Sequence, residues 1–269
     1  MIPINKAAKE DWRRIRFVFT DIDDTLTEEG CLTASAYQAV ENLQAAGLAV
    51  IPITGRPAGW CDLIARLWPV QGVVGENGAF YFRYDRAMKK MDRFYADSPE
   101  ERESKSIKLA ALAQEIVRAV PMSAIASDQA YRESDLAIDI AEDVPRVPEP
   151  QVREIVSLFE EAGATAKISS IHVNGWFGDY NKLTMTKIFA MRCLGFDLDA
   201  DNSQAIFIGD SPNDGPMFDF FDQSVGVANI QAFSEQLRVL PRYVTQGFGG
   251  AGFAEFSRAL IAIQTQSPE

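Results

Sequence analysis

The residues best suited to chemistry stand where a short apolar segment ends. Residues 15–19 are apolar apart from one arginine, and Asp21, Asp23 and Asp24 follow within a few positions. Carboxylates beside a buried segment are costly to desolvate unless they are paired or bind a cation. The pattern predicts a divalent-metal site with a carboxylate nucleophile, and its alternative is a solvated Asp-rich turn at the end of a strand.

A second acidic stretch follows a second apolar segment far along the chain. Residues 205–208 (Ala-Ile-Phe-Ile) lead into 209–214 (Gly-Asp-Ser-Pro-Asn-Asp). Functional sites of open α/β sheets lie at the carboxyl ends of strands, so we expect Asp210 to meet Asp21 there. A third apolar segment, 48–53, also ends in polar residues.

The elements expected to position these residues alternate between strands and helices at both ends of the chain. The strands predicted in these two parts lie at 15–19, 48–53, 72–74, 205–208, 224–228 and 243–245. Predicted helices separate them, including one over 182–194 that begins with Lys182. This alternation is typical of a parallel sheet with helices on its faces.

The middle of the chain follows a different pattern, in which a helix is twice followed by short strands. The predicted elements are helices over 106–120 and 151–162, strands at 124–127, 130–133 and 136–140, and a hairpin over 165–174. We therefore predict an α/β protein with a Rossmann-like core and a mainly parallel sheet. Residues 1–84 and 179–269 would form this core, and residues 85–178 an inserted α+β cap.

The overall composition favours an enzyme with a small ligand. The 26 Lys and Arg residues against 38 Asp and Glu residues give a net charge of −12, which disfavours nucleic acids and anionic membranes as partners. The absence of a long apolar segment predicts no membrane span, and we expect a cytoplasmic location. The three cysteines are odd in number and far apart, so neither a disulfide framework nor a zinc ribbon is expected. The oligomeric state stays open.

Four motifs resemble, in order and spacing, those of the haloacid dehalogenase-like phosphohydrolases, and the resemblance covers essentially the whole chain. They are Asp21-Ile22-Asp23-Asp24-Thr25, Thr54-Gly55-Arg56, Lys182 and the acidic stretch 209–214. A cap inserted between the second and third motifs resembles the Cof-type, class IIB branch. That branch includes sucrose-phosphate, trehalose-phosphate and mannosyl-3-phosphoglycerate phosphatases, as well as phosphomannomutase. The resemblance implies Mg²⁺-dependent hydrolysis of a small phosphorylated metabolite, a sugar phosphate or a derivative of one.

The resemblance also implies a role for each motif residue. Asp21 would attack phosphorus and form an aspartyl-phosphate, and Asp23 would protonate the leaving group and then deprotonate water. The implied Mg²⁺ ligands are Asp21, the backbone carbonyl of Asp23, and Asp210. The implied phosphate-binding residues are Thr54, Gly55 and Lys182, and the residues behind the metal ligands are Asn213 and Asp214. Asp24 and Thr25 would shape the turn.

Several positions keep two interpretations. Arg56 would either contact the substrate or form a surface ion pair. Asn77, in Glu76-Asn77-Gly78, would either touch the substrate or form a tight turn. Arg132 resembles an arginine that such caps place on the substrate, with a strand-end charge as the alternative, and the role of Glu133 beside it is open. Lys182 is followed by leucine where many relatives have glycine, and Lys187 on the same helix is its competitor. Lys182 fits better, because it lies at the helix start, near the strand ends.

Other chemistries find little support in the sequence. The only histidine, His172, lies between apolar residues and is interpreted as structural, which argues against a Ser-His-Asp triad. The glycine-rich segment 246–252 lacks the Gly-Lys-Ser/Thr of a P-loop. Two alternatives to a phosphatase stay open: a phosphosugar mutase using the same acids, and a catalytically silent binding or regulatory module.

Overall fold

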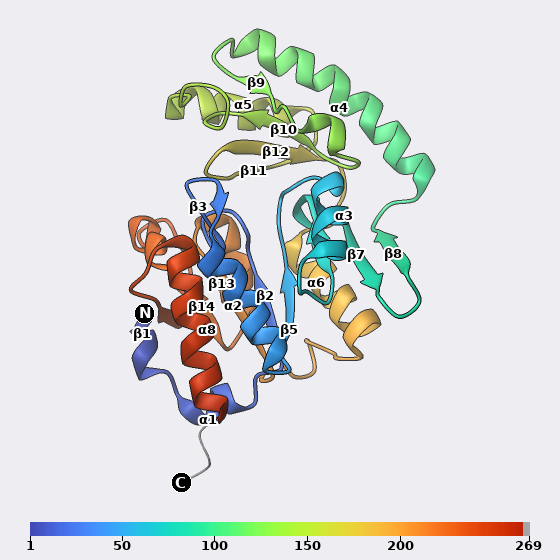
Figure 1. The fold of residues 1–269 in the computed structure, drawn as a ribbon. Helices are drawn as coiled ribbons and strands as arrows, with labels where there is room; N and C mark the ends of the chain where they lie inside the picture. Colours follow the sequence, from blue (N-terminus) through green and yellow to red (C-terminus); the bar gives the residue numbers. More distant parts are fainter. Residues whose placement is uncertain (266–269) are drawn as a thin grey trace.

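A six-stranded parallel sheet forms the centre of the larger part of the molecule, in a computed structural model that describes residues 1–265 (Figure 1). Its strands, in spatial order, are β1 (Ile2–Pro3), β15 (Tyr243–Val244), β14 (Ser224–Gly226), β13 (Ala205–Gly209), β2 (Phe17–Thr20) and β5 (Ala49–Pro52). A parallel bridge between Ile53 and Val74 continues this sheet. The strands beyond the bridge are β6 (Val73–Gly75), β7 (Phe80–Asp85) and β8 (Lys90–Tyr95), which pair antiparallel.

Helices cover both faces of the parallel sheet. Val18 and Ile206 belong to one apolar cluster and Phe19 and Phe207 to another, because successive strand residues point to opposite faces. The helices of the first cluster are α1 (Lys9–Arg13), α2 (Ala34–Ala45), α3 (Ala58–Leu67) and α8 (Gly249–Thr265). Those of the second are α6 (Lys182–Phe189) and α7 (Gly215–Phe220). Burial on both faces explains why these strands are almost uninterrupted runs of apolar residues.

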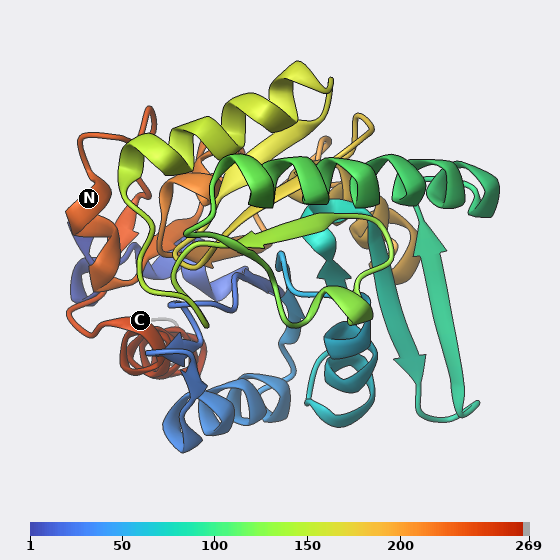
Figure 2. The same ribbon diagram turned by 90° about the horizontal axis from the view of Figure 1, so that it is seen from above.

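A smaller antiparallel sheet lies over the carboxyl ends of the parallel strands. It contains β11 (Thr165–Ile168), β12 (His172–Trp176), β10 (Leu136–Asp139) and β9 (Ala124–Ile125), in this order. Its two helices, α4 (Pro99–Ala119) and α5 (Glu149–Glu161), lie on the face away from the parallel sheet, as the view from above also shows (Figures 1 and 2). A separate apolar cluster that includes Ile116, Ile138 and Phe159 joins sheet and helices. We call this unit the cap; its opposite face looks toward the larger part.

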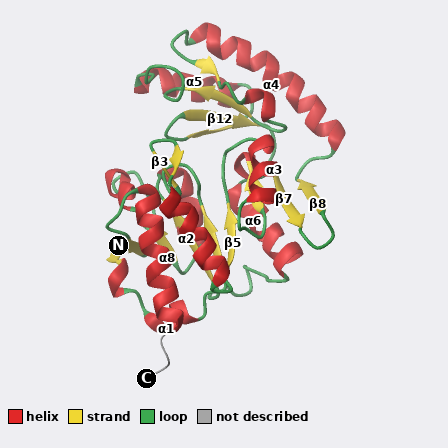
Figure 3. Ribbon diagram, viewed as in Figure 1, coloured by secondary structure: helices red, strands yellow, loops and turns green. Residues whose placement is uncertain are grey.

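The predicted fold class is confirmed, since a mainly parallel α/β core carries an α+β cap (Figure 3). The domain limits stay a prediction. The hairpin of β7 and β8 crosses the expected boundary at 84/85 and pairs with the core through β6. A short hairpin of β3 (Thr27–Glu28) and β4 (Cys31–Leu32), not predicted, follows β2. None of the helices within residues 1–265 is long and apolar enough to cross a membrane.

Two elements of the cap differ from the predictions. Residues 130–133 do not form a strand, because Gln129–Tyr131 form a 3₁₀ turn. The Gln129 side chain holds this turn back against β10, donating to the Asp135 carbonyl and accepting from the Ala137 N–H. Helix α4 begins seven residues before the predicted start, where Ser98 and Glu101 form a capping box.

Candidate active site

The two acidic stretches meet because their strands are neighbours in the parallel sheet. In the pairing of β2 with β13, Thr20 lies opposite Ile208, so both chains leave the sheet at the same edge. The Asp21 N–H donates to the Ile208 carbonyl at 2.9 Å. One carboxylate oxygen each of Asp21, Asp210 and Asp214 lies within 4.8 Å of the others. Three buried acids therefore share one small space.

Lys182 supplies the cation among these acids. It is the first residue of α6, where the Asn181 side chain forms a capping box with Thr184. Its Nζ lies 2.7 Å from Asp21 Oδ1 and 3.1 Å from Asp214 Oδ1. The competitor Lys187 instead pairs with Asp199 at 2.6 Å on the surface. The structure therefore places Lys182, and not Lys187, beside Asp21.

The charges in this space do not cancel. Burial, followed by Asp214 and Asp23, raises the pKa of Asp21 to about 8 in spite of Lys182. Burial, with Asp214 and Asp21, also raises the pKa of Asp210 well above its usual range. Although burial opposes it, Asp21 and Asp214 raise the pKa of Lys182. If all three carboxyl groups ionise, one ammonium group leaves two negative charges, and a bound divalent cation would neutralise them.

The turn after β2 and the stretch after β13 are held by short local contacts. The Asp24 N–H donates to Thr27 Oγ1 at 2.9 Å, and the Thr25 hydroxyl donates to Asp210 Oδ1 at 3.3 Å. Asp214 is fully buried, and its Oδ2 accepts the Asp210 N–H at 3.2 Å. Asn213 accepts the Ser211 hydroxyl at 2.9 Å and lines the cavity of the site. These contacts orient the acids.

The loop after β5 brings Thr54, Gly55 and Arg56 to the same edge. The buried Thr54 hydroxyl accepts the Arg56 N–H at 3.0 Å, which leaves its own proton to donate. A Cβ on Gly55 would lie 3.1 Å from Asn77 Oδ1, so a glycine here lets Asn77 approach. Asn77 has a left-handed backbone with φ 55° and donates to Asp135 of the cap at 3.4 Å. Gly55, Arg56 and Asn77 all line the cavity.

Arg56 forms an ion pair, but a buried one. Its side chain is 5% exposed, and its Nε donates to both carboxylate oxygens of Asp23, at 2.9 and 3.1 Å. The guanidinium carbon lies 4.4 Å from the centre of the Trp60 ring. The expected ion pair therefore exists, but it is buried because the cap covers this arginine, and a contact of Arg56 with a substrate stays a prediction.

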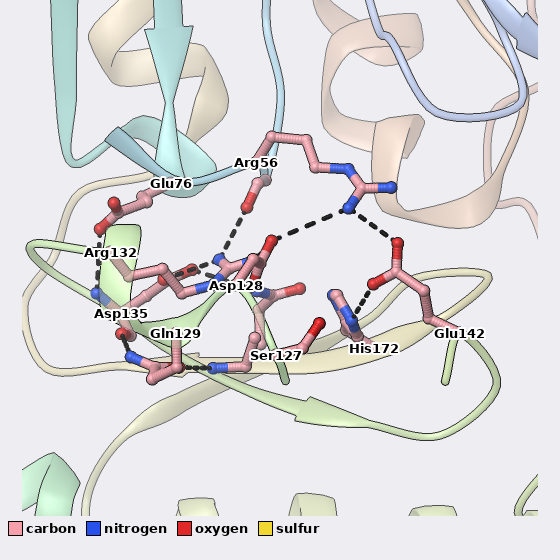
Figure 4. A network of polar contacts seen from close by, with 12 residues as sticks. Arg56, Glu76, Ser127, Asp128, Gln129, Arg132, Asp135, Glu142 and His172 are labelled. Atoms are coloured by element: carbon pink, nitrogen blue, oxygen red, sulfur yellow. Dashed lines mark hydrogen bonds and ion pairs between the residues drawn. The ribbon is translucent and has the colours of Figure 1, made fainter. Parts of the chain in front are cut away.

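Arg132 joins the cap to the core (Figure 4). Its side chain, 1% exposed, pairs with Asp128 at 3.1 Å and Asp135 at 2.9 Å, and donates to the Gly55 carbonyl at 2.9 Å. It also lines the cavity. The neighbouring Glu133 carboxylate accepts the Tyr95 hydroxyl at 2.7 Å, on the side of β8. A contact of Arg132 with a substrate stays a prediction, and the role of Glu133 stays open.

The sequence interpretation missed the contribution of Glu76. Its fully buried carboxylate accepts four backbone N–H groups, from Ala58 of the core and from residues 133–135 of the cap. Burial and the nearby Asp135 raise the pKa of Glu76 to about 8, although the N–H groups oppose this. A glutamate at the end of a buried strand was the available signal, but its partners in the cap lie almost 60 residues away.

Core and cap both line a cavity of about 30 Å³ beside these residues, and this cavity is partly open to solvent. The core contributes Asp21, Asp23, Lys182 and Asp210 to its lining, and the cap contributes the turn 167–172 between β11 and β12. A volume of this size holds a few water molecules at most. The cap therefore covers the acids closely in this structure.

The family assignment rests on the sequence as well as the geometry. A family model of the haloacid dehalogenase-like hydrolases matches residues 18–172 and 147–234, which is more than half of the chain. The chain therefore belongs to this family, as its motifs predicted. No curated protein matches it by sequence.

Solved structures share the fold over most of its length. A Thermoplasma acidophilum protein has a TM-score of 0.69 and 17% identity, covering 91% of this chain and 98% of its own. The sucrose-phosphatase of Synechocystis sp. PCC6803, solved with sucrose and phosphate, has a TM-score of 0.63 and 15% identity over 92% and 98%. A subclass IIB sugar phosphatase of the same superfamily has a TM-score of 0.60 and 16% identity over 92% and 99%. Family and fold together support the predicted phosphatase.

Proposed function

We propose that this protein is a Mg²⁺-dependent phosphomonoester hydrolase that acts on a small phosphorylated sugar or sugar derivative. The observation that carries the proposal is the Asp21 carboxylate, 2.7 Å from Lys182 Nζ and grouped with Asp210 at the edge of the parallel sheet. The cap and the sugar phosphatases among the similar structures support the substrate class.

The residues at this edge fit a divalent metal ion. Carboxylates are the hard oxygen ligands that Mg²⁺ prefers, and the charge of the ion would favour the ionised form of the grouped acids. We assign the ligands to Asp21, Asp210 and the backbone carbonyl of Asp23. Asp214 stands behind them, because its two oxygens already accept Lys182 and the Asp210 N–H. When bound, the ion would neutralise charge on the transferring phosphoryl group.

The side chains then divide the reaction between them. An Asp21 oxygen attacks phosphorus while Lys182 holds the charge of the carboxylate and of the phosphoryl group. The bond from phosphorus to the ester oxygen breaks, and Asp23 gives that oxygen its proton. Asp23 next takes a proton from water, which attacks phosphorus and releases inorganic phosphate. This second step restores the Asp21 carboxylate. Thr54 and the Gly55 N–H are assigned to the phosphate oxygens.

Replacing the nucleophile tests the proposal directly. Asp21→Asn should lower phosphate release from sugar phosphates and p-nitrophenyl phosphate by about 10⁴-fold or more, because the amide cannot form the phosphoenzyme. Asp219→Asn, which removes an exposed acid of α7, should retain the wild-type rate. Ordinary turnover in Asp21→Asn would refute the nucleophile. Phosphate release without any acceptor would distinguish the hydrolase from a mutase.

A further inference from the structure

The loop after β10 places the carboxylate of Glu142 toward the core, and hydrogen bonds to Asp139 hold the backbone of this loop. After β10, the N–H groups of Ala141, Glu142 and Asp143 donate to the carboxylate of Asp139 at 2.9, 2.8 and 2.8 Å. Asp139 is buried and lies opposite His172 in the pairing of β10 with β12. The backbone around Glu142 is therefore held by the sheet of the cap and not by the core.

Glu142 uses its two oxygens on two different parts of the molecule. Its Oε2 lies 2.8 Å from His172 Nε2 within the cap, and its Oε1 accepts Arg56 Nη1 of the core at 3.0 Å (Figure 4). A second cap acid, Asp128, lies 3.8 Å from the same Nη1. The buried His172 thus lies against the carboxylate that receives Arg56.

Arg56 carries this contact to Asp23. Its Nη1 edge faces the cap acids, while Nε and Nη2 lie within 3.1 Å of the Asp23 carboxylate. The Trp60 ring lies against the guanidinium group, whose planar shape couples its two edges. A movement of Nη1 with the cap would therefore turn the guanidinium group and change the orientation of the Asp23 carboxylate.

We propose that Glu142 and His172 are positioning residues, which orient Asp23 through Arg56 for proton transfer when the cap is closed. The inference rests on the proposed function, because it assigns Asp23 the proton of the leaving group. A general acid must lie within about 2.6–3.2 Å of the atom it protonates. Tying Asp23 to a cap residue makes that geometry depend on closure, so proton transfer occurs when the substrate is enclosed.

A series of aryl phosphates that differ in leaving-group basicity tests the inference. Glu142→Gln should lower kcat/KM for phenyl phosphate by about tenfold or more and for p-nitrophenyl phosphate by less than about twofold, because nitrophenolate leaves without a proton. His172→Gln should likewise make kcat/KM fall more steeply as the basicity of the leaving group rises. Asp143→Asn is the matched control, since Asp143 lies on the same loop but its carboxylate accepts Ser127 at 2.7 Å instead of Arg56. In Asp143→Asn, kcat/KM should depend on leaving-group basicity as it does in the wild type.

A second variant separates positioning from loss of fold. Glu142→Asp keeps the charge but is one methylene shorter and cannot reach both His172 and Arg56, so it should also lose activity most on phenyl phosphate. Thermal unfolding midpoints near the wild-type value would show that both variants fold. An equal loss on all esters, or no loss, would overturn the inference while the proposed hydrolase stands. Failure of the wild-type protein to hydrolyse any ester would instead refute the proposed function, and the inference with it.

Discussion

The environment of Asp21, Asp210 and Asp214 depends on burial more than on the residues next to them in the sequence. Each is a common surface residue, yet here they share one ammonium group, that of Lys182, inside the protein. Uncompensated buried charge lowers the free energy of unfolding. The protein without a divalent ion should therefore be less stable than the protein that holds one.

Magnesium should raise the thermal unfolding midpoint of the wild-type protein by several degrees. At about 100 times its dissociation constant, a ligand of the folded state adds about 2.7 kcal/mol to the free energy of unfolding. Asp210→Asn should lose most of this rise, because it removes a ligand, whereas Asp219→Asn should keep it. Differential scanning calorimetry with Mg²⁺ and with K⁺ at equal ionic strength measures the effect. An undiminished rise in Asp210→Asn would contradict the assigned ligand set.

Whole elements bring the catalytic side chains to their places. Parallel pairing of β2 with β13 and β5 puts three functional loops at one edge of the sheet. Helix α6 begins at that edge, so its first residue, Lys182, reaches Asp21. The capping box that Asn181 forms at the start of this helix is therefore part of the active-site geometry.

Removing two equivalent helix caps should separate stability from activity. Asn181→Ala and Ser98→Ala each break a capping box, at α6 and α4, and each should lower the free energy of unfolding by about 1 kcal/mol. Only Asn181→Ala should also lower kcat, by several-fold, because the first turn of α6 then no longer holds Lys182 in place. Urea unfolding and phosphate release measure the two effects. Equal kcat values in both variants would argue against a positioning role for the capping box of α6.

At the scale of the whole molecule, polar contacts tie the cap to the core. Arg56 meets Glu142, Arg132 meets the Gly55 carbonyl, and Glu76 accepts N–H groups of residues 133–135. These charged contacts depend on pH, and Glu142 shows it most directly. His172, and then Arg56, lower the pKa of Glu142 to about 2.

The contribution of Glu142 to stability should disappear in acid. Its pKa is lower in the folded than in the unfolded chain, so its contribution is complete above about pH 4.5 and is lost as the pH falls toward 2. Because Glu142 is partly exposed, we expect about 1–2 kcal/mol at neutral pH. The difference in unfolding free energy between wild type and Glu142→Gln should therefore be larger at pH 7 than at pH 3. Denaturant titrations at both pH values measure it, and a constant difference would contradict the assigned pair.

Local patterns were sufficient to predict the main strands, because each is an apolar run that ends in polar residues. They also separated the flanking parallel unit from the antiparallel insert, since the two have different orders of helices and strands. They failed at 130–133, where the side chain of Gln129 folds the backbone into a turn. They also missed β8, whose charged residues lie on a largely exposed strand and show no apolar alternation.

The sequence by itself determined which residue types could act, namely the acids after β2 and β13, the Thr-Gly-Arg loop and a lysine at a helix start. The structure places Lys182, which the sequence already favoured over Lys187, beside Asp21. Only the tertiary structure decided that Arg56 is buried and that Glu142 and His172 stand behind it. The physical reason is the range of the interactions. Strand and helix patterns depend on neighbours a few residues apart, whereas the charge balance of a buried site depends on residues that only folding brings together.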